Sequence, residues 1–278
     1  MFINPITEGV VQLNLKTYTE SNRNAWNEVN PIHQKHNPIN LKEAIQTKGF
    51  NALDEHITRT LLQLGLHGKN VAQLCCNNGR EVLSMVNLGA QSGTGFDISD
   101  SAIEEAQELA KTSGLPCTFV RTDVYDIDSI HSNQYDLIYI SIGALTWLPD
   151  LHKFFSIAST LLKKDGALVI YEIHPLLNML AMEDEPEFED PLKIAFSYFK
   201  SDPWINNTGI DYVGNTTYDA QTSYSFSHTL ASIFNAIIQS GIHITEYEEH
   251  SHDISCIFTH LEKENKLPMC YTLIGKKA

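Results

Sequence analysis

The 278-residue sequence lacks the basic surface that a nucleic-acid-binding protein needs. Its 19 lysines and arginines stand against 34 aspartates and glutamates, which gives a net charge of −15, and the basic residues form no cluster longer than a pair. Binding to phosphate backbones depends on a concentration of positive charge. The charge balance therefore argues against a nucleic-acid partner.

Cysteine pairs and long hydrophobic runs are also missing. The five cysteines are odd in number and include no C-x-x-C, which is typical of a reduced, cytoplasmic protein. The start, MFINPITEGVVQLNL, has no basic region followed by an apolar one, so it does not predict a signal peptide. No stretch approaches the ~20 apolar residues of a membrane span. We therefore expect a cytoplasmic protein with no membrane partner.

What the sequence does contain is a regular alternation of strand and helix patterns. Candidate strands lie at 70–74, 92–98, 116–123, 135–143 and 167–174, with candidate helices at 79–90, 101–114 and 150–166 between them. This alternation predicts an α/β fold with a parallel sheet and right-handed crossovers. A helix at 227–241 and strands at 242–250 and 268–277 would complete the sheet with an edge hairpin. Shorter helical patterns at 19–29 and 51–68 precede it.

The first strand-to-helix turn, LCCNNG at 74–79, is poor in glycine. Ligands of such sheets bind at the carboxyl ends of the strands, where glycine normally allows a close backbone approach. Only Gly79 remains here, although Asn77 and Asn78 tolerate left-handed conformations better than most residues. Adjacent cysteines point in different directions, so Cys75 and Cys76 are expected to be buried thiols that bind no metal.

The later turns carry acidic and small residues. Asp97 ends the second strand, at a position where a carboxylate can accept hydrogen bonds from ribose hydroxyls. Its alternative role is to start the next helix, but Ser101 and Glu104 already match a capping box, with Ser99 and Asp100 as further candidates. Asp123, after the third strand, is either an acceptor for an adenine amine or an ordinary turn aspartate.

These motifs together resemble a known family. VAQLCCNNGREVL, GFDIS, FVRTDVYD, YDLIYISIGALTWLPDL and LLKKDGALVIYEIHP are similar to the class I S-adenosylmethionine-dependent methyltransferases, over about residues 68–175. The first motif is closest to a bacterial branch of small-molecule-type members without the glycine-rich form. The resemblance implies a Rossmann-like, doubly wound, seven-stranded and mostly parallel sheet with one antiparallel edge strand. It also implies S-adenosylmethionine as cofactor and methyl transfer to a small-molecule acceptor.

The resemblance also implies roles for individual residues. The turn after the first strand would lie along the methionine part of the cofactor, and it comprises Leu74, Cys75, Cys76, Asn77 and Gly79. Asp97 would bind ribose beside Ile98, Asp123 and Val124 would bind the adenine edge, and Ser141, Ile142 and Gly143 would lie near the sulfonium. The sequence departs from the family at Gln73, where an acidic residue is common, and at Cys75 and Asn77, which replace glycines.

Two regions fall outside that core. Residues 1–67 are expected to form an N-terminal helical segment that covers the cofactor site, in front of a methyltransferase domain at 68–278. Residues 175–225, the cap segment, are rich in aromatic residues and are either a cap over the pocket or a solvated loop with ordinary packing. We expect Trp147, Trp204 and Tyr212 to contact the acceptor.

Candidate general bases follow the fifth strand and begin the late helix: Glu172, His174 and His228. Each has an alternative structural role. His250-x-His252-Asp253 looks like a fragment of a metal site, but no third ligand is evident, so we expect surface histidines and no metal. Two other functions remain open: an NAD-dependent oxidoreductase, although a full G-x-G-x-x-G is absent, and a non-catalytic S-adenosylmethionine-binding module.

Overall fold

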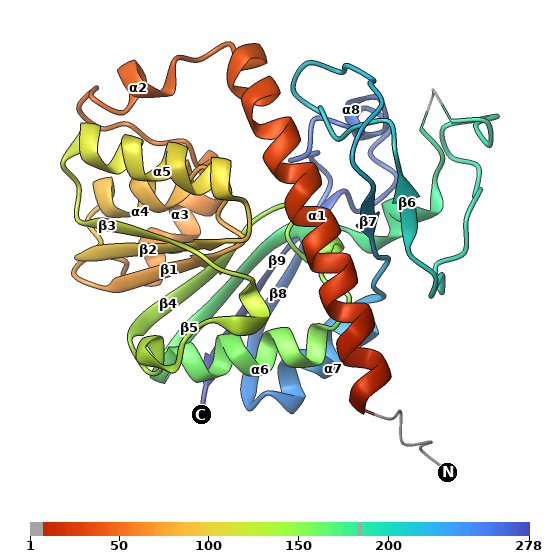
Figure 1. Cartoon of the computed structure of the whole chain (residues 1–278). Coiled ribbons are helices and arrows are strands. Elements are labelled where there is room, and N and C mark those ends of the chain that lie inside the picture. The colour runs from red at the N-terminus through yellow and green to blue at the C-terminus, as the bar shows by residue number, and fades with distance from the viewer. Residues whose placement is uncertain (1–7, 183–184) are drawn as a thin grey trace.

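The fold is built around one seven-stranded sheet (Figure 1). The computed structural model describes residues 8–182 and 185–278, with side chains from residue 15 onward. The strands are β1 (Asn70–Leu74), β2 (Ser92–Asp97), β3 (Cys117–Arg121), β4 (Tyr135–Ile140), β5 (Leu162–Ile173), β8 (Ile242–His250) and β9 (Cys270–Lys277). Their order is β3-β2-β1-β4-β5-β9-β8.

The pairing confirms the expected doubly wound sheet. Strands β1 to β5 pair in parallel, whereas β9 runs antiparallel to both of its neighbours, β5 and β8. The antiparallel edge is therefore a hairpin in which β9 is inserted between β5 and the outermost strand β8. Strand order reverses between β1 and β4, which is the place where ligands of such sheets bind.

Helices cover both faces of the sheet and enclose two hydrophobic cores. On one face lie α3 (Glu55–Gln63), α4 (Arg80–Asn87) and α5 (Asp100–Ser113), and on the other α6 (Leu151–Leu161) and α7 (Leu230–Gln239). The central strands are largely apolar, as the run of β4 shows, which suits strands that are buried on both sides.

Three helix boundaries differ from the sequence-based expectation. The helix expected at 150–166 ends at Leu161, and β5 begins at once, with Asp165 in a left-handed turn (φ 60°) inside the strand. Helix α5 starts at Ser99, whose hydroxyl accepts from the amide of Ala102, and not at the capping box of Ser101. Helix α3 begins later than residue 51, because Asp54 accepts from the amide of Ile57.

The largest difference is the first helix. Helix α1 (Glu8–His36) has 29 residues where the sequence pattern predicted only 19–29. Few of its residues are apolar and buried, so it carries no strong hydrophobic stripe that would reveal its length. Residues 1–7 of the expected N-terminal segment lie outside the described residues.

The cap segment holds little regular structure. It contains a short 3₁₀ helix, η4 (Pro175–Met179), and a two-stranded sheet of β6 (Trp204–Asn206) and β7 (Ser223–Ser225), which lies beside α1 (Figure 1). Its residues 183 and 184 lie outside the described residues. Helices α2 (Leu41–Ala44) and α8 (Thr259–Glu262) are single turns, and η1 (Val124–Asp126), η2 (Ser129–His131) and η3 (Leu145–Trp147) are 3₁₀ turns. Among the described helices, none is long and apolar enough to cross a membrane.

Candidate active site

A cavity of about 560 Å³ lies at the carboxyl ends of the central strands. One wall consists of the turns that follow β1, β2, β3 and β4, and the opposite wall consists of α1, residues 212–213 and the loop at 254–257. This volume is typical of a small-ligand site. Every expected cofactor residue except Leu74 and Gly79 lines it: Cys75, Cys76, Asn77, Asp97, Ile98, Asp123, Val124, Ser141, Ile142 and Gly143.

The two exceptions, Leu74 and Gly79, support the turn and do not line the cavity. Leu74 is fully buried in the hydrophobic core. Gly79 starts α4 in a left-handed conformation (φ 71°), and a Cβ atom there would lie 2.2 Å from Cε1 of Phe119. Glycine is needed at this position because the turn packs directly against β3, and not because a ligand approaches it.

The cysteines and asparagines of the first turn have backbone and packing roles. Cys75 (φ 58°) and Asn77 (φ 49°) both adopt the left-handed conformation that glycine would otherwise supply. The sulfur of Cys76 fills the space above Gly95, where a Cβ would lie 2.6 Å from it. Both thiols are free, and burial raises their pKa well above the usual value, so they stay protonated at neutral pH.

Asp97 faces the cavity from the end of β2. Its Oδ2 accepts from the amide of Asn77 at 2.8 Å and its Oδ1 from the amide of Ser99 at 2.9 Å. Burial raises the pKa of Asp97, although these amides oppose the shift. A carboxylate has about four acceptor positions. Asp97 therefore keeps acceptor capacity for two hydroxyls of a ligand.

Helix α1 reaches the third turn through a lysine. The Nζ of Lys16 lies 3.0 Å from Oδ2 of Asp123 and also contacts Asp126. The other oxygen of Asp123 accepts from the amide of Tyr125 at 3.0 Å and so starts η1. Asp123 is thus a turn residue whose carboxylate also lines the cavity, and its bond to an adenine amine stays a prediction.

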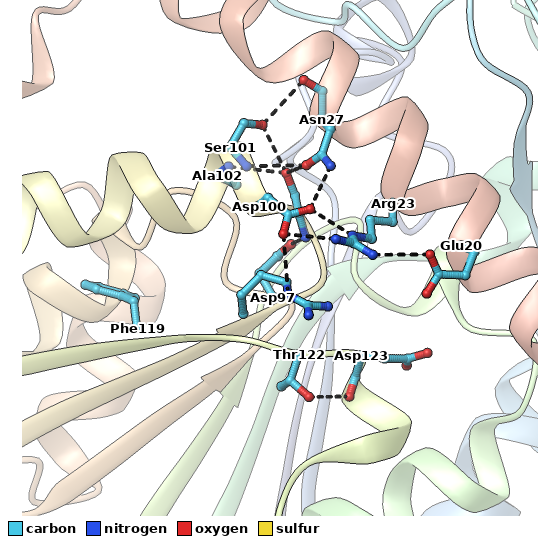
Figure 2. A network of polar contacts seen from close by, with 12 residues as sticks. Glu20, Arg23, Asn27, Asp97, Asp100, Ser101, Ala102, Phe119, Thr122 and Asp123 are labelled. Carbon is cyan, nitrogen blue, oxygen red and sulfur yellow. Dashed lines mark hydrogen bonds and ion pairs between the residues drawn. The ribbon is translucent and has the colours of Figure 1, made fainter.

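A second set of contacts holds α1 against the start of α5, as Figure 2 shows. The guanidinium of Arg23 donates to both oxygens of Asp100, at 2.8 and 3.1 Å, and lowers the pKa of that carboxyl to about 2. Asn27 also donates to Asp100 and accepts from the hydroxyl of Ser99. Helix α1 is therefore fixed directly beside the end of β2, where Asp97 lies.

Glu172 supports the fourth turn from behind the cavity. Its carboxylate accepts from the amides of Gly143 at 2.6 Å, Leu145 at 3.2 Å and Ile173 at 2.9 Å. Burial raises the pKa of Glu172 to about 7, against the opposing effect of these amides. The structure therefore gives Glu172 contacts that position the loop at 141–145.

Gln73, the departure from the family pattern, leaves one acceptor unused. Its amide nitrogen donates to Ser141 Oγ at 2.9 Å and to Glu81. Its Oε1 is buried and has no hydrogen-bond partner among the described residues. Since Ser141 and Glu81 both line the cavity, this polar cluster fits the charged methionine end of an S-adenosylmethionine molecule.

The two expected histidine bases lie away from the cavity lining, as does Glu172. His174 contacts Oε1 of Glu249 at 3.1 Å, and its Nδ1 accepts from the amide of Leu176. His228 donates to the carbonyl of Leu148 at 2.9 Å. Burial lowers the pKa of both histidines. Each histidine therefore makes the kind of contacts expected of a structural residue, which was its alternative role.

Aromatic side chains form part of the far wall. Trp26, His33, Trp147 and Tyr212 line the cavity, with ring centroids 5.3 Å apart for the two tryptophans and 4.5 Å apart for His33 and Tyr212. Trp204 is not brought to the cavity. Its ring packs against Phe196 and under the ammonium of Lys200, and its Nε1 donates to Ser227.

Sequence reasoning missed the residues that α1 contributes. Thr19, Asn22, Trp26, Asn30 and His33 of α1, with Asn37 just after its end, line the cavity and recur at intervals of three and four residues. That spacing places them on one face of a helix. The signal was present in the sequence, but it was a stripe of mostly polar residues and not the apolar stripe that identifies a core helix.

The sheet order and the cavity at its reversal point define a doubly wound α/β protein with a nucleotide-type ligand site. Residues 71–166 match a family model described as a methyltransferase domain. The fold and this match support a class I S-adenosylmethionine-dependent methyltransferase.

Known proteins with a similar sequence or structure agree with this family. A ribosomal RNA large subunit methyltransferase K/L of Pseudoalteromonas atlantica is 32% identical over 105 residues, which is 37% of this chain but only 15% of that protein. An S-adenosylmethionine-dependent methyltransferase structure from Listeria monocytogenes has a TM-score of 0.61 at 17% identity, covering 80% of this chain and 97% of that one. Magnesium protoporphyrin IX methyltransferase of Synechocystis, solved with bound SAH, has a TM-score of 0.57 at 14% identity and covers 94% and 99% of the two chains.

Proposed function

We propose that the chain transfers a methyl group from S-adenosylmethionine to a small-molecule acceptor. In this proposal the ribose of the cofactor bonds to Asp97 beside Ile98, and the adenine edge meets Asp123 and Val124. The methionine part lies along the turn at 74–79, against Cys75, Cys76 and Asn77, which line the cavity. The sulfonium lies near residues 141–143. Helix α1 then covers the cofactor, because its contacts with Asp100 and Asp123 are at the same edge.

The observation that carries the small-molecule acceptor is the acidic cavity of about 560 Å³. Its far wall comes from α1 and residues 212–213, which leaves room for a ligand of limited size. Among its lining residues that the structure describes, the acidic Glu81, Asp97, Glu105 and Asp123 outnumber the single basic residue, Arg80. Such a site disfavours a phosphate backbone. The structurally similar magnesium protoporphyrin IX methyltransferase is named after a small molecule.

We infer that His33 serves as the general base. Its Nε2 lies 3.1 Å from the carbonyl oxygen of Ile210, so Nε2 must carry the proton and Nδ1 is the basic nitrogen. Burial lowers the pKa of His33, which keeps the imidazole neutral near pH 7. His33 lines the cavity next to Tyr212, where an acceptor would lie. Transfer itself is an in-line displacement that depends on holding the acceptor close to the methyl group.

Two measurements test this function. S-adenosylhomocysteine should stabilise the protein against heat, by about 2.7 kcal/mol at a concentration one hundred times its Kd, and NAD should not. Transfer of a radiolabelled methyl group should then be measured over a metabolite library, with total ribosomal RNA as a parallel substrate. Label in a metabolite supports the proposal. Label in RNA alone would replace it with an RNA methyltransferase, and stabilisation without any transfer would favour a binding module.

We also infer that the protein works in the reducing cytoplasm. All five cysteines, Cys75, Cys76, Cys117, Cys256 and Cys270, are free thiols in the structure. Fractionation of cells that express the tagged full-length chain would test this inference, and recovery outside the cytoplasmic fraction would contradict it.

A further inference from the structure

A cluster of histidines lies outside the cavity, on elements that are distant in the sequence. His56 comes from the first turn of α3, and His250 ends β8. Their ring centroids are 4.2 Å apart, and the ring of His252 lies 5.2 Å from that of His250. Glu248 is two residues before His250 on the same strand, so both side chains project from one face of the sheet. The ligand-capable atoms of His56, Glu248 and His250 all lie within 4.8 Å of one another.

The imidazoles converge on one hydroxyl. The Nε2 atoms of His56 and His250 lie 3.0 and 2.9 Å from Oγ1 of Thr272. A hydroxyl has one proton, so one imidazole accepts from it and the other donates to it. Neutral imidazole is the form that binds metals.

We propose that His56, Glu248 and His250 bind a zinc ion. Two imidazole nitrogens and one carboxylate oxygen are a donor set that zinc accepts, and water completes the tetrahedron. Ligand atoms around zinc at 2.0–2.2 Å are roughly 3.4 Å apart, so the present spacing closes with small side-chain rotations. His250 belongs to the His250-x-His252-Asp253 fragment seen in the sequence, whereas His56 and Glu248 are ligands that the sequence did not reveal.

Neighbouring groups explain why other candidates are not ligands. His252 is held by the hydroxyl of Tyr171, 2.7 Å from its Nε2. Cys270 lies beside His252, but burial raises the pKa of its thiol to about 12, so it is not a thiolate at neutral pH. The ion is thus bound by the exposed side of the cluster, where Glu248 lies.

Zinc at this site would order the loop that follows β8. Residues 254–257 line the cavity, and this loop begins directly after His250. A zinc ion that joins α3 to the end of β8 fixes the point from which the loop departs. We therefore infer that zinc orders residues 251–258 and with them one part of the cavity wall.

The test uses the full chain, freed of metal by chelation, and zinc chloride alone as the probe. Competition with a chromogenic zinc indicator and elemental analysis should show one zinc per chain. Because partners of a metal ligand are already worth about 10- to 100-fold in affinity, each of His56→Gln, His250→Gln and Glu248→Gln should lose at least about tenfold. His243→Gln, at an exposed histidine on the same strand, is the matched control and should bind zinc like the wild type.

Glu248→Gln keeps the test interpretable, because Glu248 is exposed and its substitution should not disturb folding. Zinc should also slow amide exchange in residues 251–258 of the wild type and not of Glu248→Gln. Substoichiometric zinc, or affinity unchanged by the three substitutions, would overturn the site. So would binding that Cys256→Ser abolishes, since Cys256 is an exposed thiol. Unchanged exchange in the zinc-loaded wild type would overturn the effect on the loop.

Discussion

The two walls of the cavity are built in different ways. The wall of turns uses main-chain amides, as when Asn77 and Ser99 bond to Asp97, and Gly143 and Leu145 bond to Glu172. The opposite wall uses side chains from a long helix and from loops that lie more than a hundred residues away in sequence. The first wall is local and follows directly from the sheet. The second exists only after tertiary packing.

This difference explains how a common fold can hold one cofactor and yet accept different substrates. Turns at the carboxyl ends of parallel strands are fixed by the sheet, so their amides and carboxylates keep their places. Helix α1 and the cap segment are tied to each other by bonds such as those between Asn22 and the backbone of Tyr224. We expect changes in the first wall to affect the cofactor and changes in the second to affect the acceptor.

The largest effect is expected on the second wall, at His33. His33→Gln keeps a donor for the carbonyl of Ile210 but has no basic nitrogen, so the methyl-transfer rate should fall roughly 10²–10⁴-fold. Affinity for S-adenosylhomocysteine should stay unchanged. Because burial lowers the pKa of His33, the wild-type rate should fall only as pH drops below about 6.5, and this acid limb should vanish in the variant.

His36→Gln is the matched control for that experiment. His36 lies on the same helix and contacts Asp211 at 3.0 Å, but it does not line the cavity. Single-turnover transfer and its pH profile should resemble the wild type. Equal losses in both variants would show that α1 acts through its attachment to the cap segment and that His33 is not the base.

How much of this arrangement the sequence predicts depends on which wall is considered. Strand β1 at 70–74 and the turns after β1, β2, β3 and β4 follow from apolar runs that end in polar residues. By contrast, α1 is mostly polar, and its buried Asn22, Asn30 and His33 gain partners only from distant segments. A periodicity search based on apolar residues cannot detect such a helix.

The candidate bases His174 and Glu172 fall outside the cavity lining for a related reason. His174 and Glu172 follow β5 at the ligand edge, but β9 and its neighbours pack beside them, and local amides and Glu249 occupy their polar atoms. A position at the end of a strand predicts closeness to the site. It does not predict which way the side chain points, because that depends on packing against elements far away in the sequence.

The next largest effect concerns the support beneath the first wall. Burial raises the pKa of Glu172 from 4.5 to about 7, so the folded protein binds a proton that the unfolded chain releases. Glu172 contributes roughly 3 kcal/mol to the free energy of unfolding below pH 4.5. This contribution is lost as pH rises through about 7. Urea unfolding across this range should show the decline in the wild type and not in Glu172→Gln. Glu104→Gln, at an exposed position, should keep it.

A smaller effect is expected at the carboxylate of the first wall. Asp97→Ala should weaken S-adenosylmethionine binding by ~1.5–3 kcal/mol, because it removes hydrogen bonds to a charged group. Isothermal titration calorimetry on the folded variant checks this, with Asp202→Ala at an exposed site as the control. Unchanged affinity in a folded Asp97→Ala protein would remove Asp97 from the cofactor site and would weaken the division between the walls.

The smallest effects should separate two aromatic residues of the cap segment. Tyr212 lines the cavity and contacts the ring of His33, whereas Trp204 packs against Phe196 and away from the lining. Loss of one aromatic contact costs about 0.5–1.5 kcal/mol, so Tyr212→Ala should raise the KM of the acceptor by roughly two- to tenfold. Trp204→Ala should leave this KM within about threefold of the wild type, as for substitutions outside a site. Both variants should bind S-adenosylhomocysteine with nearly wild-type affinity, since neither residue belongs to the wall of turns. A large loss of that affinity in Trp204→Ala would place the cap segment over the cofactor, and the two walls would then not be independent.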